Sequence, residues 1–114
     1  MNAEEFLDAI RIVVRDGAAS EVLSVLQKPP GRRPSEELIT RSLWYNSLDS
    51  SQRRMVSAIV QDAANRAIFG FLCVVDGVRS IESATDKGKI ELRYVKGSST
   101  LLNPPDGEML HDIW

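Results

Sequence analysis

The sequence has few of the residues that bind transition metals or form disulfides. Its 114 residues include one cysteine, Cys73, and one histidine, His111. A single cysteine excludes an internal disulfide, and structural zinc sites need four Cys or His ligands at regular spacings. Cys73 lies within an apolar segment, where we expect a buried, reduced thiol. We therefore predict no metal site.

The sequence also lacks an excess of one charge and a long apolar run. The formal net charge is −2 and aromatic residues make up 6%, whereas a nucleic-acid-binding surface needs a basic stripe. The longest apolar run, 67–75, is shorter than the roughly 20 residues of a membrane-spanning helix. The acidic start has no basic and apolar regions typical of a secretory signal. We expect a cytoplasmic protein with no nucleic-acid or membrane partner.

Catalytic and phosphate-binding motifs are also missing. Neither G-x-G-x-x-G, G-x-x-x-x-G-K-[ST] nor G-x-S-x-G occurs. His111 and Asp112 are adjacent, but neighbouring helical residues do not face each other, so we interpret His111 as part of a docking tail. Asp76, Glu82 and Asp86 do not have the spacing of a calcium loop. We predict no catalytic residue and no cofactor, and therefore a protein that is not an enzyme.

The strongest pattern that is present is one long helix, from about 49 to 76. Apolar residues recur every four positions in two neighbouring rows, which indicates an amphipathic helix. One row holds Met55, Ile59, Ala63, Ala67, Phe71 and Val75, and the other holds Val56, Val60, Ala64, Ile68 and Leu72. Its last two turns, 69–75, are apolar on every side, so we expect this end to be buried and the helix to be central.

Three shorter helices precede it. The first covers 3–16 and ends at a glycine cap, Gly17, with Phe6, Ile10, Val13 and Val14 on its buried face. A second covers 20–27, with an apolar stripe of Val22, Leu23 and Leu26. Three prolines and a glycine in residues 28–34 then break the chain. Ser35 begins a third helix that ends near Asn46 and turns Leu38, Ile39, Leu43 and Trp44 toward the core.

The segment after Gly77 changes character. Residues 90–95 alternate apolar and polar side chains, and 100–102 can pair with them after a turn at 96–99. A last helical turn is expected within 108–114. The sequence therefore predicts an α+β fold, mainly α, in a single domain over 1–114. About four helices with a long central fourth helix precede a C-terminal β-hairpin and a short terminal helical turn.

Three groups of residues are candidates for contacts with a partner or ligand. Arg32 and Arg33 give positive charge to the proline-rich loop, and Trp44 and Tyr45 are of the types enriched at protein interfaces. Asp62, Asn65 and Arg66 interrupt the apolar pattern of the long helix, where they line either a groove or a solvent-facing side. Asp62 and Arg66 also have the spacing of a helical ion pair.

The architecture is similar to that of many small stand-alone bacterial proteins that bind one partner, including immunity-type proteins of toxin systems. This resemblance rests on a compact domain with few catalytic residue types and covers no particular residues, so no site is transferred. We predict a non-enzymatic intracellular protein-interaction module, inhibitory or immunity-like, whose partner is another protein. The alternatives are a ligand-binding or enzymatic domain with a pocket near Asp62, Asn65 and Arg66, and a homo-oligomeric structural subunit, for example a homodimer.

Overall fold

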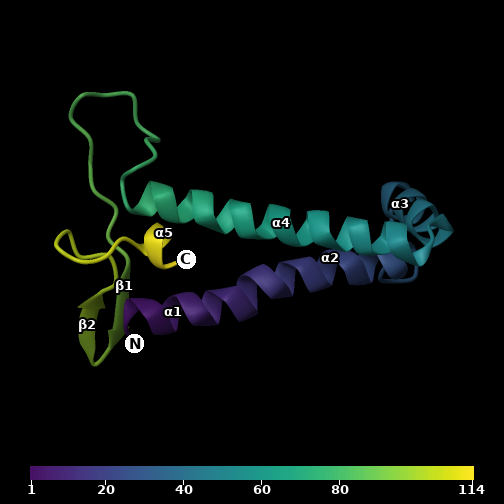
Figure 1. The fold of residues 1–114 in the computed structure, drawn as a ribbon, viewed down its shortest axis with the longest axis horizontal. Coiled ribbons are helices and arrows are strands. Elements are labelled where there is room, and N and C mark those ends of the chain that lie inside the picture. The colour runs from purple at the N-terminus through teal and green to yellow at the C-terminus, as the bar shows by residue number, and fades with distance from the viewer. The chain divides into compact units, whose positions relative to one another are not determined.

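The computed structural model describes residues 1–114, and most of them are helical (Figure 1). The main helices are α1 (Ala3–Ile10), α2 (Gly17–Gln27), α3 (Glu36–Ser47) and α4 (Ser50–Val75). Strands β1 (Arg93–Lys96) and β2 (Ser98–Leu101) form an antiparallel hairpin, and α5 (Leu110–Ile113) ends the chain's regular structure. The predicted fold class, with its long fourth helix, C-terminal hairpin and terminal helical turn, is confirmed.

Contacts divide the chain into two compact units. The first unit comprises residues 1–12 and 66–114, and the second comprises residues 13–65. Helix α4 contributes its last turns to the first unit and its earlier turns to the second, while remaining one helix.

The first unit has the better-developed core. Leu7 of α1, Leu72 and Val75 of α4, and Leu110 of α5 form a buried cluster, and Leu7 and Leu110 have no exposed surface. Six partly buried side chains pack against this cluster: Ala3, Phe6, Ile68, Leu92, Ile113 and Trp114. Burial of such side chains stabilises a fold by about 1.5–3 kcal/mol each. The expected docking of the C-terminal turn onto helices is confirmed.

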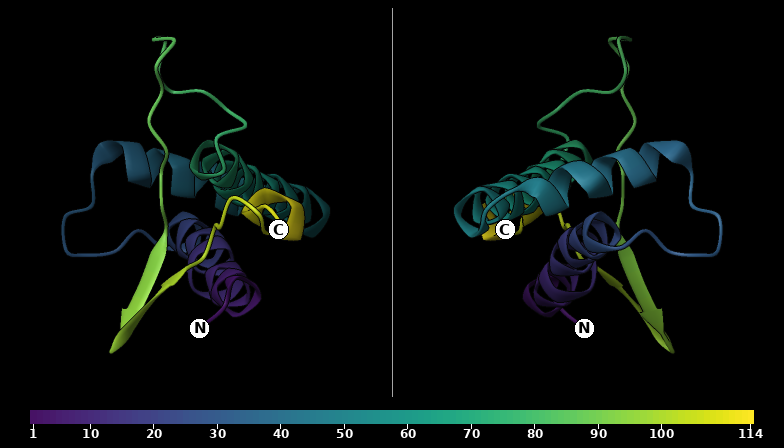
Figure 2. Two further views of the ribbon diagram at one scale, coloured as in Figure 1. Left: turned by 90° about the vertical axis from the view of Figure 1, so that its left-hand side faces the viewer. Right: turned by 90° about the vertical axis from the view of Figure 1, so that its right-hand side faces the viewer.

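The hairpin belongs to the same unit, and Figure 2 shows its two strands joined by a tight turn. Its register pairs Arg93 with Leu101 and Lys96 with Ser98, and Gly97 adopts the positive φ of 71° that the turn requires. Asn103 fixes the base of the hairpin: its Oδ1 accepts the backbone N–H of Leu92 at 2.8 Å. Residues 78–86 form no helix or strand.

The N-terminal helix differs from the prediction in two ways. A π-helical segment, Arg11–Asp16, joins α1 directly to α2, so the helix does not end at Gly17. The expected buried face was also wrong at its C-terminal end, because Val13 is 72% and Val14 is 42% exposed. A π segment closes hydrogen bonds to the fifth residue and therefore shifts the positions of later side chains around the helix. Leu7 occupies the centre of the core instead.

The expectation that α4 is apolar and buried on all sides at its end was also wrong. In the last two turns, Leu72, Cys73 and Val75 are buried, whereas Phe71 is 63% and Phe69 is 39% exposed. Of the two predicted apolar rows, the one through Met55 and Phe71 is exposed apart from Val75, and the neighbouring row is buried or half-buried. The buried state of the Cys73 thiol is confirmed.

Helix α4 is the one helix of the structure that is long and apolar enough to cross a membrane, judged by length and composition alone. Only 22% of its most apolar stretch is buried. The core helix of a soluble protein can meet the same criterion, so one such helix is weak evidence. The cellular location therefore stays a prediction.

In the second unit, the helix starts follow the predicted caps. The Ser35 hydroxyl accepts the N–H of Leu38 at 3.3 Å, which caps α3. The side chain of Asp49 accepts the N–H of Gln52 at 2.8 Å, and Gln52 accepts the N–H of Asp49 at 3.0 Å, which completes the predicted capping box before α4. These local bonds position both helices.

Candidate interaction surfaces

The second unit buries very few apolar side chains. Among its hydrophobic residues only Ala19 and Tyr45 are fully buried. Eight larger hydrophobic side chains are exposed there: Val13, Val14, Val22, Ile39, Leu43, Trp44, Met55 and Ile59. The predicted orientation of Ile39, Leu43 and Trp44 toward the core was therefore wrong.

The junction of α2 and α3 is held by polar side chains of α3. The last carbonyl of α2, that of Gln27, accepts hydrogen bonds from Asn46 Nδ2 at 3.0 Å and from the Ser42 hydroxyl at 3.4 Å. Asn46 Nδ2 also donates to the Ser42 oxygen at 3.2 Å. A helix end leaves carbonyls without intrahelical partners. The sequence of α3 supplies those partners and so fixes where the two helices meet.

A small groove lies between these two helices. Its volume is about 200 Å³, and its walls are mainly aliphatic. Its lining residues are Glu21, Val22, Val25, Leu26, Leu38 and Arg41. Binding pockets for small molecules usually enclose about 300–1,000 Å³. The groove is therefore sized for one large side chain rather than for a whole ligand.

The rim of the groove combines apolar and charged groups. Val22, which lines the groove, is 46% exposed. The carboxylate of Glu21 adds a negative charge, and the guanidinium of Arg41 is paired with the carboxylate of Glu37 one turn earlier in α3. An apolar pocket with a polar rim is the usual arrangement of a protein-binding surface.

Next to this groove, α3 and α4 are joined through Tyr45. This tyrosine is 5% exposed, and the guanidinium carbon of Arg53 lies 5.5 Å from the centre of its ring. Arg53 Nη2 also donates to the carbonyl oxygen of Asn46 at 2.9 Å. Tyr45 is therefore a structural residue, whereas its neighbour Trp44, 54% exposed, remains accessible for contacts.

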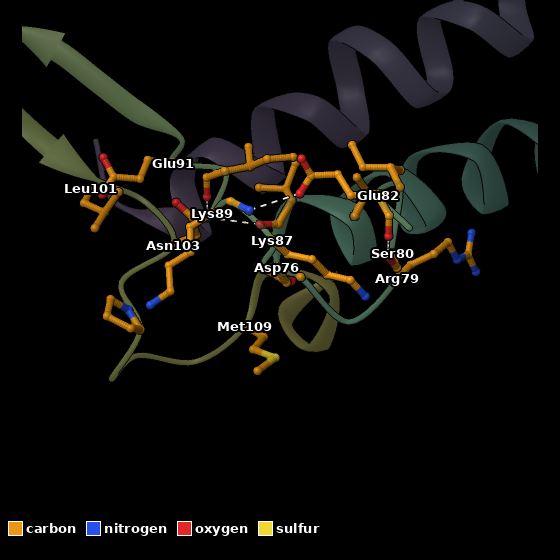
Figure 3. A pocket seen from close by; sticks show the side chains of 17 residues that line it. Asp76, Arg79, Ser80, Glu82, Lys87, Lys89, Glu91, Leu101, Asn103 and Met109 are labelled. Atoms are coloured by element: carbon orange, nitrogen blue, oxygen red, sulfur yellow. Dashed lines mark hydrogen bonds between the residues drawn. The ribbon is translucent and has the colours of Figure 1, made fainter. Parts of the chain in front are cut away.

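The first unit contains a larger cavity of about 630 Å³ (Figure 3). It is lined by the end of α4, the loop that follows and the base of the hairpin, with Asp76, Arg79, Glu82, Lys87, Lys89 and Glu91 as its charged residues. The loop is closed on itself, because Glu82 Oε2 accepts the N–H of Gly88 at 3.0 Å. The cavity offers both signs of charge and no dominant one.

Asp76 also connects α4 to the C-terminal segment. Its Oδ2 atom lies 2.8 Å from the backbone N and 2.7 Å from ring Nδ1 of His111. The side chain of Asp76 is 2% exposed and that of His111 is 16% exposed. The rings of His111 and Phe69 form a T-shaped pair with a centroid distance of 5.9 Å. Sequence separation concealed this pair, since His111 pairs with Asp76 and not primarily with its neighbour Asp112.

The residues singled out from the sequence lie in different places. Arg32 and Arg33 are exposed in the loop between α2 and α3, and Asp62 and Arg66 are exposed on α4, with Asn65 half-buried. Neither the groove nor the larger cavity is lined by any of these five residues. Sequence reasoning did not identify the groove, although it recognised the apolar stripe of α2 that lines it.

No three His, Cys, Asp or Glu side chains converge in a geometry that could hold a metal ion. Comparisons with protein-family models, curated proteins and solved structures give no significant match.

Proposed function

We propose that this chain is a non-enzymatic protein-interaction module, inhibitory or immunity-like, that binds another protein through the α2–α3 groove. The observation that supports this proposal is the combination of a single-side-chain groove with exposed apolar residues around it. Binding energy at protein interfaces is concentrated in a few large side chains that fill such pockets. The groove is too small to enclose a typical ligand.

The chemistry of the groove describes the partner segment. An aliphatic or aromatic anchor fills the space between Val22, Leu26 and Leu38, where its apolar surface leaves water. A basic residue beside the anchor then faces Glu21. Such a charge contributes mainly to specificity and to the rate of association.

Site-specific photocrosslinking in the cells that naturally make the protein tests this proposal. A benzophenone amino acid at Glu21, an exposed residue that lines the groove, should give an adduct with one other protein, and the same probe at exposed Gln61 on α4 should not. Val22→Lys places a charge in the groove and should remove the adduct. Equal labelling from both probe positions, or an adduct that survives Val22→Lys, would contradict the proposal.

A second candidate function, the binding of a small molecule, is favoured by the volume of the larger cavity, about 630 Å³. Its mixed charges suit a zwitterionic ligand, with Lys89 and Glu91 among the groups that would contact it. A thermal-shift screen with amino acids and other small zwitterions tests this function, and Lys89→Glu should abolish any shift that depends on the cavity.

A further inference from the structure

The charged residues that line the larger cavity differ in how available they are to a ligand (Figure 3). Every lining residue lies between positions 74 and 109 and belongs to the first unit. The volume of the cavity, about 630 Å³, is within the range of about 300–1,000 Å³ that is usual for small-molecule sites. The existing partners of each charged side chain therefore decide which kind of ligand the cavity can hold.

The three carboxylates that line the cavity are already bonded within the chain. Asp76 Oδ2 lies within hydrogen-bond distance of the backbone N and ring Nδ1 of His111. Glu91 Oε2 accepts hydrogen bonds from Nε and Nη2 of Arg93 at 3.0 and 2.9 Å. Glu82 Oε2 accepts a backbone N–H of its own loop at 3.0 Å. A cationic group of a ligand would have to share each of these carboxylates with its present partner.

The two lysines that line the cavity have no such partners. The side chains of Lys87 and Lys89 form no ion pair or hydrogen bond in the structure, and both residues are exposed. The third lining cation, Arg79, is directed toward α4, since its Nη1 would lie 2.5 Å from a Cβ atom at Gly70. Ammonium groups form strong, charge-assisted hydrogen bonds with carboxylates. Lys87 and Lys89 can therefore bind an anionic group without breaking any contact of the chain.

The remaining wall of the cavity is mainly apolar. Ile81 in the loop is 71% exposed, and Ile90 before the hairpin and Met109 before α5 are each 43% exposed. These side chains come from three separate segments and line the same cavity. A ligand that covers them removes apolar surface from water, which favours binding. A small inorganic anion would leave the same side chains in water.

We propose that the cavity binds an amphipathic anion. The ligand is a small organic acid whose carboxylate contacts Lys87 and Lys89 and whose apolar body covers Ile81, Ile90 and Met109. The proposal rests on the second candidate function, the binding of a small molecule by this cavity, and specifies the ligand. Of a zwitterion, the carboxylate and the apolar part would be recognised, because its ammonium group meets only carboxylates that already have partners.

Three ligands that share an indole ring separate the contributions of the two charges. Indole-3-propionate has the carboxylate alone, tryptamine has the ammonium group alone, and tryptophan has both. In isothermal titration calorimetry of the full chain, indole-3-propionate should bind with a Kd between about 10 µM and 1 mM. Tryptamine should bind at least about tenfold more weakly, and tryptophan no more tightly than indole-3-propionate. Octanoate and octylamine repeat the comparison with an aliphatic body.

Charge reversal at the two lysines tests the site. The double variant Lys87→Glu/Lys89→Glu should reverse the preference, so that tryptamine binds at least about tenfold more tightly than indole-3-propionate. Loss of folding could not produce such a reversal. Lys28→Glu/Lys96→Glu is the matched control, because it changes the net charge equally at two exposed residues that do not line the cavity. It should leave both affinities unchanged.

Four results would overturn the proposal. They are tryptamine binding as tightly as indole-3-propionate, tryptophan binding at least about tenfold more tightly than indole-3-propionate, equal effects of the two double variants, and no binding of indole-3-propionate or octanoate. Tight binding of tryptophan that needs its ammonium group would leave the second candidate function standing. Absence of binding by all five ligands would contradict both. Crosslinking at the α2–α3 groove is read separately and is unaffected by either result.

Discussion

Asp76 and His111 are joined twice through one carboxylate oxygen: Asp76 Oδ2 lies 2.8 Å from the backbone N and 2.7 Å from ring Nδ1 of His111. A carboxylate can only accept hydrogen bonds, so ring Nδ1 carries the shared proton when Asp76 is ionised. The contact links the residue that directly follows α4 to α5, and the two bonded residues lie 35 positions apart in the sequence. It is therefore the main polar connection between the long helix and the C-terminal segment.

Removing this carboxylate should destabilise the first unit. Asp76→Ala leaves two nearly buried N–H donors of His111 without their acceptor, and we expect a loss of about 2–3 kcal/mol in the free energy of unfolding. Asp112→Ala is the matched control, because Asp112 is 60% exposed and its oxygen lies 3.4 Å from Nε2. It should change stability by less than about 0.5 kcal/mol. Urea titration followed by circular dichroism measures both, and equal losses would contradict the structural role of Asp76.

Neighbouring residues near the end of α4 should respond very differently to truncation. Leu72 is 2% exposed within the buried cluster, so Leu72→Ala should cost about 2–5 kcal/mol. Phe71 is 63% exposed, so Phe71→Ala should cost less than about 1 kcal/mol. Thermal unfolding followed by circular dichroism separates the two. A large loss for Phe71→Ala would restore the earlier expectation of a helix end buried on all sides.

Two glycines of the first unit should have opposite responses to alanine. At Gly70 an added Cβ would lie 2.5 Å from Arg79 Nη1, which is the flexible end of an exposed side chain and can move away. Removing a glycine from the interior of a helix gains about 0.8–1 kcal/mol, so Gly70→Ala should be neutral or stabilising. Gly77 has a φ of 79° just after α4, and Gly77→Ala should destabilise by about 1 kcal/mol despite its open surroundings. Differential scanning calorimetry can compare them, and a destabilising Gly70→Ala would show that Arg79 is held in place.

Arg11 should not be replaceable by lysine. Its Nη2 atom lies 2.8 Å from each of the carbonyl oxygens of Ile113 and Trp114, and the guanidinium carbon lies 5.0 Å from the centre of the Trp114 ring. The second guanidinium nitrogen, Nη1, donates to Asp8 Oδ1 at 2.6 Å. A lysine ammonium has one nitrogen and no plane, so it cannot bond Asp8 and the two carbonyls while lying over the Trp114 ring. We expect Arg11→Lys to cost about 1–2 kcal/mol. The measurement is the protection of the α5 amides from hydrogen exchange. Arg54→Lys is the control, because Arg54 is an exposed residue of α4. Unchanged protection in Arg11→Lys would contradict this role.

Features determined by neighbours in the sequence were predictable. Ser35, Asp49 and Gln52 cap their helices as their spacing indicated, because a capping bond needs only residues within one turn. The turn of the hairpin at Gly97 follows from a local conformational requirement in the same way. Asn2 and Glu5 form a further capping box at the start of α1, and its spacing was visible in the sequence although it was not recognised.

Features determined by tertiary contacts were not predictable from one sequence. Both apolar rows of α4 have the same period, and only the packing of other elements leaves the row through Ile59 exposed. The π segment has no distinctive composition, so Val13 and Val14 were assigned to the wrong side of the helix. The α2–α3 groove likewise depends on how far apart two helices lie, which Ser42 and Asn46 determine through a single carbonyl.

The π segment, Arg11–Asp16, makes the N-terminal helix tolerant of changes in length. A π-bulge is in effect one surplus residue accommodated inside an α-helix. Deleting one residue within the segment should therefore be accepted as a return to ordinary α-helix, without a change in α1. Because the bulge already absorbs the surplus residue, the side chains of α2 should keep their helical faces after the deletion. The α2–α3 groove lies entirely within the second unit, so its lining should be preserved.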